Sequence, residues 1–562
     1  MAFLNTNHIK KYQYKINLIF SLISEVENKY LYKITFFNIL SSLLEITNIG
    51  ILIPILIGSK MENTPFIYNF QIEQGLLIIF LITILKGILN KFVLINQENI
   101  KNKLTDYLKE ETFRNIIFSE GQLIRNFSKG ELQSLLINNI NRSVLVLDQF
   151  IRILKYSISI IIYLIGIFIL GKTSILPLFI AFFSTLFAAL IIPSNSWLFG
   201  KMQTNINVIM QKTIGDGLQG IKDVRAARSE SWLLKKYSSQ NKAIRNILFN
   251  TIKRSSSFDI LRDCFVVGFV SLWFIYFTNN IDRVKLVAIL LFSYKGSNYL
   301  SSLIFSYRIM FNSLSGYENL KRIRNELYFS VDKILDNSHK NISINSRDNI
   351  HWELINKDKN IFLNKIVLKV DAITIITGNS GSGKTTLLDC FCGLDNEKNS
   401  IWEIREKNSQ KILKINNNNI RKIISYAPQN PYLFEASIYE NIFFENFNEK
   451  RKECHLKIKL LSRWLKVLKL DKNFDNDFKV TDSFNLSSNR FSQGEVQRFG
   501  LIRMWIRNNK VEVLDEPTAF LDNEMSSIVR EIIIKRSKKK YILIATHDKE
   551  LIKYGSQLFK IK

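Results

Sequence analysis

Two stretches of the sequence carry residues suited to nucleotide chemistry. The first, TIITGNSGSGKTTLLDC (374–390), has the spacing G-x4-G-K-[ST] at Gly378, Gly383, Lys384 and Thr385. An apolar strand, a glycine turn and a following helix would point backbone N–H groups and a helix N-terminus at bound phosphates. Lys384 would meet the β- and γ-phosphate charge, and the Thr385 hydroxyl would bind Mg²⁺. A chance glycine turn is disfavoured because a strand precedes the loop and a helix follows it.

The second stretch, VEVLDEPTAFLD (511–522), places two adjacent carboxylates at the end of an apolar strand. Asp515 is predicted to hold Mg²⁺ directly or through water. Glu516 is predicted to orient or deprotonate the attacking water. Together the two stretches predict hydrolysis of a magnesium-bound nucleotide, with ATP as the expected cofactor.

Two further polar residues each follow an apolar strand. ISYAPQNPYLF (424–434) contains Gln429, and ILIATHD (542–548) contains His547. A lone Gln or His is more often structural, but ligand sites of parallel sheets form beyond the carboxyl ends of the strands. We therefore expect both side chains at the nucleotide site.

These motifs lie in a part of the chain that differs in composition from the rest. From about residue 350 onward, short apolar runs alternate with helical patterns, which predicts an α/β domain over 350–562. Residues 321–349 are charged and rich in Asn and Ser, and we expect a linker there. Residues 1–320 carry long apolar runs and are predicted to form a transmembrane domain of helices with cytoplasmic extensions.

Six stretches have the roughly 20 mostly apolar residues that a membrane helix needs. Several lie back to back, which disfavours buried helices of a soluble protein. The stretches are 32–57, 75–96, 150–171, 174–193, 258–278 and 285–307. We therefore expect six spans.

Charge orients the predicted spans and argues against nucleic acid. The net charge is +28, but the Lys and Arg residues are spread along the chain between apolar runs. With the N-terminus inside, the segment 194–257 alone holds eleven Lys and Arg, whereas the outside segments hold only Lys60, Lys172 and Arg283. This asymmetry follows the positive-inside rule. We expect an integral protein of a bacterial inner membrane with its soluble domain in the cytoplasm, no cleaved signal peptide and no nucleic-acid partner.

The motifs together resemble a known family. Phosphate loop, glutamine loop, a signature at FSQGE (491–495), LDEPTAFLD and the histidine follow in the order of ATP-binding cassette (ABC) domains. With six helices ahead, the whole chain resembles an exporter-type ABC half-transporter. The stretch SLLEITNIGILIPIL (42–56) is loosely similar to the branch that flips lipid-linked oligosaccharides and glycolipids.

The resemblance implies roles for individual residues. Glu516 would be the catalytic base, His547 would contact the γ-phosphate, and Gln429 would link the metal and the lytic water to the membrane domain. Asp522 would lie at a dimer contact, and Trp352 is the available candidate for stacking on adenine. The residues implied to bind phosphates and Mg²⁺ are Gly378, Asn379, Ser380, Gly381, Ser382, Gly383, Lys384, Thr385 and Thr386.

The signature departs from the family form LSGGQ. Ser492 and Gly494, which the resemblance implies grip the γ-phosphate in the opposite subunit, are retained, whereas Gln493 replaces a glycine. Glu495 adds a negative charge near the triphosphate, which costs about 1 kcal/mol at 4 Å in water and about 4 kcal/mol at a protein surface. We expect this charge to weaken dimer closure without removing the chemistry.

The resemblance implies a dimer, because the signature of one chain completes the site of another. A homodimer is expected because every catalytic group is present, and a heterodimer stays open. Lys86 and Lys295 fall in the middle of predicted spans and suggest a cavity with excess positive charge. The other ionisable residues in the spans are Glu45, Arg152, Lys155, Arg262 and Asp263.

The leading hypothesis is export or flipping of an anionic lipid-linked glycan or glycolipid. A peptide exporter is the first alternative, without a peptidase domain because only roughly 30 residues precede the first span. A regulatory half with low activity in a heterodimer is the second. Cys390 and Cys392 follow the phosphate loop, and we expect them to pack against a sheet and not to bind metal.

Overall fold

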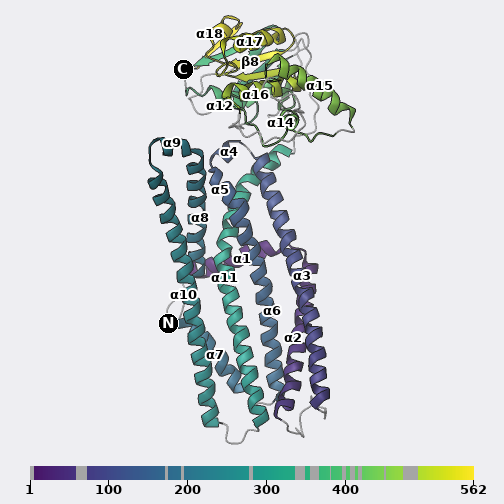
Figure 1. Ribbon diagram of the computed structural model, residues 1–562, viewed down its shortest axis with the longest axis vertical. Helices are drawn as coiled ribbons and strands as arrows, with labels where there is room; N and C mark the ends of the chain where they lie inside the picture. The colour runs from purple at the N-terminus through teal and green to yellow at the C-terminus, as the bar shows by residue number, and fades with distance from the viewer. Residues whose placement is uncertain are drawn as a thin grey trace. The chain divides into compact units, whose positions relative to one another are not determined.

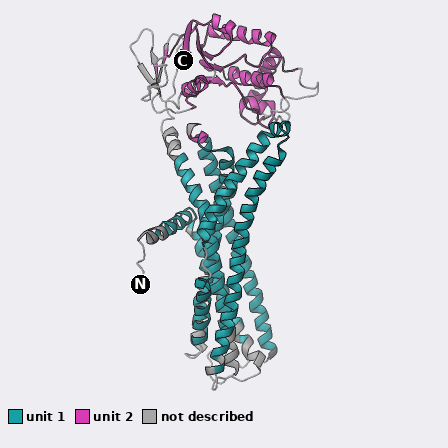
Figure 2. Ribbon diagram, turned by 90° about the vertical axis from the view of Figure 1, so that its left-hand side faces the viewer, with its two compact units in different colours: residues 1–117, 126–328 teal, residues 118–125, 329–562 magenta. Residues whose placement is uncertain are grey.

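The computed structural model divides into two compact units, one of residues 1–117 and 126–328, the other of residues 118–125 and 329–562 (Figure 2). The residues that it describes are 6–57, 72–119, 121–170, 175–191, 195–277, 283–335, 349–354, 366–379, 381–394, 400–405, 412–415, 420–448, 451–471 and 491–561.

The first unit is helical. Most of its helices run side by side, while α1 lies across them and α9 lies across the ends of α8 and α10 (Figure 1). The pairs α7 with α10, α5 with α8, α8 with α10 and α2 with α6 pack against each other. The helices are α1 (Thr6–Ile23), α2 (Asn28–Ile57), α3 (Ile72–Phe118), α5 (Lys129–Ser134), the π-helix η1 (Leu135–Asn139), α6 (Ile140–Leu170), α7 (Ile175–Ile191), α8 (Ser196–Gln219), α9 (Ile221–Ala226), α10 (Glu230–Phe277) and α11 (Arg283–Leu335).

The six stretches predicted to span a membrane fall largely within α2, α3, α6, α7, α10 and α11. Among the described residues, the helix Glu73–Phe118 is long and apolar enough to cross a membrane by itself. The pair Phe179–Ile191 and Ser196–Gln219, bent by 48°, is a second candidate if the two helices form one span. The number of six spans therefore stays a prediction.

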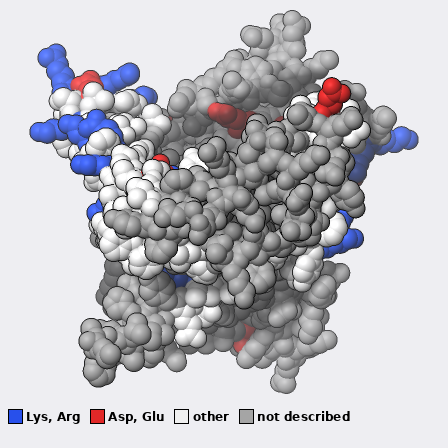
Figure 3. All heavy atoms as spheres, turned by 90° about the horizontal axis from the view of Figure 1, so that it is seen from below, with Lys and Arg blue, Asp and Glu red and all other residues white. Residues whose placement is uncertain are grey.

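The exposed side of α3 is apolar along the predicted span. Leu77, Phe80 and Leu81 expose 60%, 63% and 55% of their surface, and Leu76 and Ile84 are also exposed. Contiguous exposed apolar surface of this kind marks an interaction site. Seen from the lower end of Figure 1, most of the described surface is uncharged, and most Lys and Arg atoms lie at its rim (Figure 3).

The buried core of the first unit reaches into the segment predicted as linker. Leu320, Ile323 and Leu327 are fully buried and pack with α1, α3 and α6. Their spacing of three and four residues places them on one face of α11, which continues to Leu335. Part of the segment 321–349 is thus helical, because apolar residues at helical spacing lie between its charges. The predicted domain boundaries themselves stay a prediction.

The second unit is α/β, as the sequence predicts. A parallel sheet has the order β6-β7-β8-β3-β9, and an antiparallel sheet has the order β2-β1-β4-β5. The strands are β1 (Asn349–Leu354), β2 (Ile366–Leu368), β3 (Ile373–Gly378), β4 (Ser400–Arg405), β5 (Ile412–Ile415), β6 (Ile424–Ala427), β7 (Val511–Asp515), β8 (Tyr541–Ala545) and β9 (Gln557–Ile561). The helices are α4 (Gly121–Arg125), α12 (Lys384–Phe391), α14 (Ile438–Phe443), α15 (Lys452–Val467), α16 (Gln493–Arg507), α17 (Asn523–Ser537) and α18 (Lys549–Lys553).

Both faces of the parallel sheet are buried. Val513 and Leu543 face one cluster, which contains α12 and strands of the antiparallel sheet. Leu514 and Ile544 face the opposite cluster, which contains α15, α16, α17 and α18. A sheet covered on both faces requires continuous apolar strands, which explains why ITIIT and YILIA lack polar alternation. All five strands are parallel, so the residues after β3, β6, β7 and β8 lie along one edge.

Candidate nucleotide site

The phosphate loop connects the buried strand β3 to α12. Gly381 and Gly383 have φ angles of +80° and +88°, values that side chains with a Cβ rarely adopt. At Gly378, an added Cβ would lie 2.7 Å from the Ile561 carbonyl oxygen and from Ser382 Oγ. The glycine spacing is therefore required by the backbone path. Ser380 lies outside the described residues.

Lys384 links the phosphate loop to His547, which follows β8 by two residues. Its Nζ donates to the carbonyl oxygens of Gly378 at 2.8 Å and Asn379 at 3.0 Å, and lies 2.9 Å from His547 Nε2. The ammonium therefore lies at the edge where β3 and β8 end. This contact brings together two residues that the sequence predicts at one site.

Thr385 and Asp515 are in direct contact. The Thr385 hydroxyl donates to Asp515 Oδ2 at 2.7 Å, and Asp515 ends β7 with only 2% of its surface exposed. Burial raises the pKa of Asp515 above its usual value, and the Thr385 hydrogen bond opposes this rise. Hydroxyl and carboxylate oxygens are the ligands that Mg²⁺ prefers. The pair is thus chemically suited to the metal that the sequence predicts there.

The backbone around Glu516 directs its side chain toward β8. Glu516 has a φ of +47°, and its N–H donates to the Ala545 carbonyl at 2.8 Å. The Glu516 carboxylate accepts from the His547 N–H at 3.3 Å and lies 3.8 Å from His547 Nε2. A positive φ in a residue other than glycine is uncommon, and strained backbone of this kind occurs at functional sites as well as at turns and helix ends. Asp515, Glu516, His547 and Lys384 are therefore neighbours.

The remaining predicted residues are placed by the ends of their elements. Gln429 follows β6 by two residues, and β6 pairs with β7 through Ala427 and Leu514. Asp522 caps α17 by accepting from the Met525 N–H at 2.7 Å. Thr386 lies exposed in the first turn of α12, and Trp352 lies in β1, with its side chain outside the described residues. No adenine contact is assigned to Trp352.

The signature forms a helix cap that changes the interpretation of Glu495. Ser492 Oγ accepts from the Glu495 N–H at 3.3 Å, and Glu495 Oε2 accepts from the Ser492 N–H at 2.7 Å. This reciprocal pair is a capping box at the start of α16. Arg498 Nη2 lies 3.9 Å from Glu495 Oε1. The S-x-x-E spacing of Ser492 and Glu495 is present in the sequence and is the signal that could have predicted this cap.

Gly494 of the signature has no room for a side chain. An added Cβ would lie 2.5 Å from the Phe520 carbonyl oxygen. The glycine retained here is therefore required by contact with the segment after Glu516.

Gln497 is a site residue that the sequence reading did not single out. It is 2% exposed, its Nε2 donates to the Glu516 carbonyl oxygen, and its Oε1 accepts from the Phe520 N–H at 3.3 Å. The side chain thus holds both ends of the turn that follows Glu516. Its only sequence signal is a polar residue within the apolar face of α16.

A buried ion pair accounts for Glu512, a carboxylate inside strand β7. Glu512 is 1% exposed, and both of its oxygens accept from Arg536 Nε of α17 at 3.0 Å.

Cys390 and Cys392 are 2% and 3% exposed within the apolar cluster, where packing was expected. Among the described residues, no group of three or more His, Cys, Asp or Glu side chains could hold a metal ion by itself.

Most of the ionisable residues of the predicted spans are paired. Glu45 of α2 contacts Lys86 of α3 at 3.0 Å and Lys295 of α11 at 3.4 Å. Its carboxylate also accepts from the hydroxyls of Tyr299 at 2.7 Å and Tyr163 at 3.1 Å. The predicted excess of positive charge at Lys86 and Lys295 is therefore reduced by one shared carboxylate. Elsewhere Arg152 pairs with Asp148 at 3.0 Å and Arg262 with Asp263 at 2.7 Å.

A buried hydroxyl in the phosphate loop is a second feature that suits a phosphate ligand. Ser382 Oγ is buried and has no hydrogen-bond partner among the described residues. A buried hydroxyl without a partner is unfavourable unless a ligand or water completes it. The second unit thus has the fold and the site of a phosphate-loop nucleotide-binding domain.

Comparison with known proteins agrees with a phosphate-loop nucleotide-binding domain. The ABC transporter family model matches residues 364–519. The lipoprotein-releasing system ATP-binding protein LolD of Wigglesworthia glossinidia brevipalpis is 31% identical over 220 residues, which cover 37% of this chain and 88% of that protein. The chain therefore belongs to the ABC transporter family.

Two longer matches include the helical unit. The lacticin-481/lactococcin-DR transport/processing ATP-binding protein of Lactococcus lactis is 25% identical over 483 residues, covering 83% of this chain and 66% of that protein. A solved structure of a bacterial Atm1-family ABC exporter with ATP bound matches with a TM-score of 0.71 at 14% identity, covering 95% of this chain and 92% of that one. This likeness shows the fold of an exporter. Alignments to export ATP-binding/permease proteins span only about a third of those relatives' length.

Proposed function

We propose that this chain is one half of a dimeric ABC exporter, embedded in a membrane, that uses ATP hydrolysis to move an amphiphilic substrate. The observation that carries the proposal is the convergence of Lys384, Thr385, Asp515, Glu516 and His547 at one edge of the parallel sheet. The exporter fold of the whole chain supports coupling of that site to the helical unit. A bacterial inner membrane and a cytoplasmic second unit are parts of the same proposal.

Each residue at the edge has a role in the proposed reaction. Backbone N–H groups of the loop and Lys384 would hold the phosphates of ATP. Thr385 and Asp515 would hold Mg²⁺, which would neutralise charge that develops on the phosphates. Glu516 would orient and deprotonate the water, and His547, fixed beside it, would contact the terminal phosphate.

The proposed unit is a homodimer, because Ser492 and Gly494 are present alongside the catalytic carboxylate. The capping box supports a normally formed signature helix despite the substituted residues. Cross-linking of the purified chain, together with its mass in detergent, tests this assembly. A chain that stays monomeric and inactive until another protein is added would instead be a half of a heterodimer.

ATPase activity of the purified chain in lipid tests the central proposal. We expect magnesium-dependent hydrolysis that Glu516→Gln lowers by about 10²–10⁴-fold while ATP binding persists. Equal activity in the parent and in this variant would contradict an exporter driven by its own site. A chain that binds ATP without hydrolysing it would be a regulatory half.

An anionic lipid-linked glycan or glycolipid is the substrate class that we propose first. Two lysines meet one carboxylate at the Glu45 cluster, so a phosphate that displaces Glu45 would gain two cationic partners. The test is stimulation of the ATPase by a polyprenyl-pyrophosphate glycan. We expect Lys86→Ala and Lys295→Ala to reduce that stimulation, and unchanged stimulation in both would refute the class.

Peptide export is the second candidate. It is favoured by the Lactococcus lactis relative, whose name assigns it transport and processing of lacticin-481 and lactococcin-DR. The same ATPase assay separates the candidates, because stimulation by peptides and not by the glycan would select this one.

A further inference from the structure

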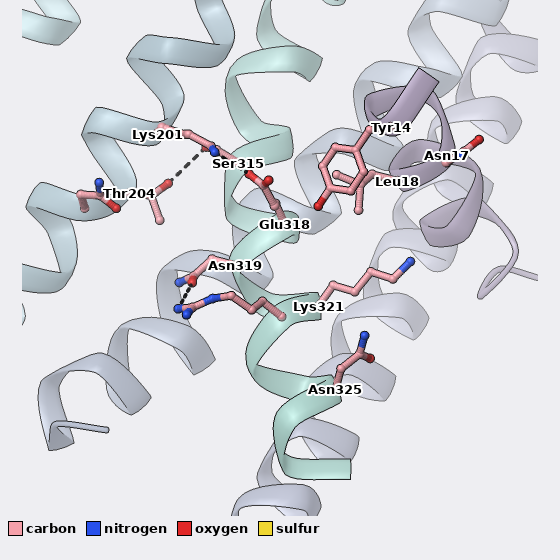
Figure 4. A pocket seen from close by; sticks show the side chains of 12 residues that line it. Tyr14, Asn17, Leu18, Lys201, Thr204, Ser315, Glu318, Asn319, Lys321 and Asn325 are labelled. Atoms are coloured by element: carbon pink, nitrogen blue, oxygen red, sulfur yellow. Dashed lines mark hydrogen bonds and ion pairs between the residues drawn. The ribbon is translucent and has the colours of Figure 1, made fainter. Parts of the chain in front are cut away.

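A cavity of about 630 Å³ lies between α1, α8 and α11 of the first unit (Figure 4). Its volume falls within the range of ligand sites in proteins, which is about 300–1,000 Å³. Amide and hydroxyl side chains make up much of its lining, among them Asn17, Asn205, Asn319, Asn325 and Tyr14. The cavity is separate from the nucleotide site, which lies in the other unit.

The lining carries more positive than negative charge. Lys201, Lys321 and Arg322 line the cavity, and Glu318 is the carboxylate among the described lining residues. Glu318 is engaged by Lys201 at 3.4 Å. The excess is two positive charges, which favours an anionic ligand.

Neither of the other two cations forms an ion pair with a carboxylate of the described cavity lining. Lys321 Nζ donates to Ser21 Oγ at 2.8 Å, and within the described part of the chain no carboxylate lies at ion-pair distance from it. Arg322 donates to Asn319 Oδ1 at 3.0 Å and lies 3.9 Å from the exposed carboxylate of Glu326 outside the lining. Both cations thus retain capacity for a ligand.

A partly buried arginine adds positive charge behind the cavity wall. Arg142 of α6 donates to Thr204 Oγ1 and Ser315 Oγ, both at 3.1 Å, and these two hydroxyls line the cavity. Its other acceptors are Gly200 O, Asn312 O and Asn312 Oδ1, all neutral. Burial without a carboxylate partner lowers the pKa of Arg142 to about 10. A partly buried cation without a carboxylate partner attracts an anion, because its field is screened less than in bulk water.

The helix α1 that covers the cavity has apolar residues on two sides. Leu18 and Leu22 pack into the core of the unit, while Ile16 and Phe20 expose 45% and 62% of their surface. α1 also lies across the direction of the other helices (Figure 1). A helix with these properties fits the membrane interface, where its exposed apolar side would enter the acyl boundary. The cavity beneath it would then lie at the level of the lipid headgroups.

We propose that this cavity binds a phosphate-bearing anion, namely the headgroup of an anionic lipid. Lys321 and Arg322 contact the phosphate, and the surrounding amides and Tyr14 hydrogen-bond the polar headgroup. The proposal depends on the membrane location proposed above but not on ATP hydrolysis or on the transported substrate. A bound lipid would fix α1 against α8 and α11.

Native mass spectrometry of the delipidated full chain tests this site. The protein is titrated with phosphatidylglycerol, with phosphatidylcholine, and with inorganic phosphate in separate arms. We compare the parent with Lys321→Gln/Arg322→Gln, which removes two charges and keeps polar side chains. Lys242→Gln/Arg245→Gln on the exposed side of α10 is the matched control.

The parent and the control are expected to bind phosphatidylglycerol in preference to phosphatidylcholine. Lys321→Gln/Arg322→Gln is expected to bind phosphatidylglycerol about tenfold more weakly, the scale of losing a charge-assisted hydrogen bond. Glu318→Gln, which removes the carboxylate of the lining, is expected to tighten binding. A loss of folding would weaken lipid binding in both variants, whereas a binding site predicts weaker binding in Lys321→Gln/Arg322→Gln and tighter binding in Glu318→Gln. Thermal unfolding of each variant provides a second check.

Each outcome has a defined meaning. Saturable binding of inorganic phosphate that Lys321→Gln/Arg322→Gln abolishes, without any preference for phosphatidylglycerol, would keep the phosphate site but overturn the lipid source. Equal binding of every ligand by the parent, both double variants and Glu318→Gln would overturn the site altogether. ATPase measurements do not enter this test, so its failure leaves the proposed function unaffected.

Discussion

The Thr385 hydroxyl donates a 2.7 Å hydrogen bond to Asp515 Oδ2, although the two residues lie 130 positions apart in the sequence. The contact joins the first turn of the helix after β3 to the end of β7. Because β8 lies between those strands, the same edge also holds His547 beside Glu516. The nucleotide site is thus a property of one sheet edge to which three strands contribute.

Glu516→Gln should lower kcat of the ATPase by about 10²–10⁴-fold, because a proton acceptor is removed from the position of the attacking water. ATP affinity should change little, since the phosphate loop remains. Steady-state hydrolysis and nucleotide binding measured on one preparation check both parts. Glu531→Gln, an exposed carboxylate on α17, is the matched control and should behave as the parent.

Glu495→Ala should lower thermal stability, while Glu495→Gln should retain it. Alanine loses the reciprocal half of the capping box, a change of about 1 kcal/mol, whereas glutamine still accepts from the Ser492 N–H. ATPase activity of Glu495→Gln should match the parent. A marked rise in that activity would show instead that the Glu495 charge opposes nucleotide binding.

Gln497→Ala should reduce kcat with little change in ATP affinity. The substitution removes one of the two donors to the Glu516 carbonyl, which keeps the Ala519 N–H at 3.2 Å, and it leaves the Phe520 N–H without its Gln497 partner. A buried polar group that loses its partner costs about 1–3 kcal/mol. The turn after the catalytic carboxylate would then lose its fixed position. Gln497→Glu keeps an acceptor for the Phe520 N–H but places a buried carboxylate against the Glu516 carbonyl oxygen, so it should not restore kcat. A parallel fall in ATP affinity in either variant would point to a wider structural defect.

Breaking the Glu512–Arg536 pair on either side should destabilise the second unit by about 3–5 kcal/mol, because one buried charge loses its partner. Replacing both residues, as Glu512→Leu/Arg536→Met, should cost much less than the sum of the single changes. Unfolding midpoints of the four proteins form a double-mutant cycle. Additive losses would mean that the pair does not act as a unit.

Asp548→Asn should remove part of the pH dependence of stability in acid. Burial favours a raised pKa for Asp548, but hydrogen bonds from Arg530 and Thr518, both at 2.9 Å, outweigh it and hold the pKa below its usual value. A lowered pKa in the folded state means that the stabilisation is present above the unfolded value of about 3.9 and is lost as pH falls through the folded value. Thermal unfolding across that range should show a shallower acid decline in the variant, and identical slopes would refute the assignment.

The sequence by itself determined the chemistry of the second unit. Phosphate loop, carboxylates, Gln429 and His547 each follow an apolar strand, and parallel strands bring their carboxyl ends to one edge. Such motifs are local, so their residue types and spacing carry the information. The capping box at Ser492 and Glu495 was equally local.

Only the tertiary structure decided which distant residues meet. Gln497 reaches the Glu516 backbone, Arg536 neutralises Glu512, and Glu45 joins two lysines from other helices. It also placed Arg142 behind the cavity between α1, α8 and α11. These partners come from separate elements whose packing depends on the whole fold, so no spacing in the sequence encodes them.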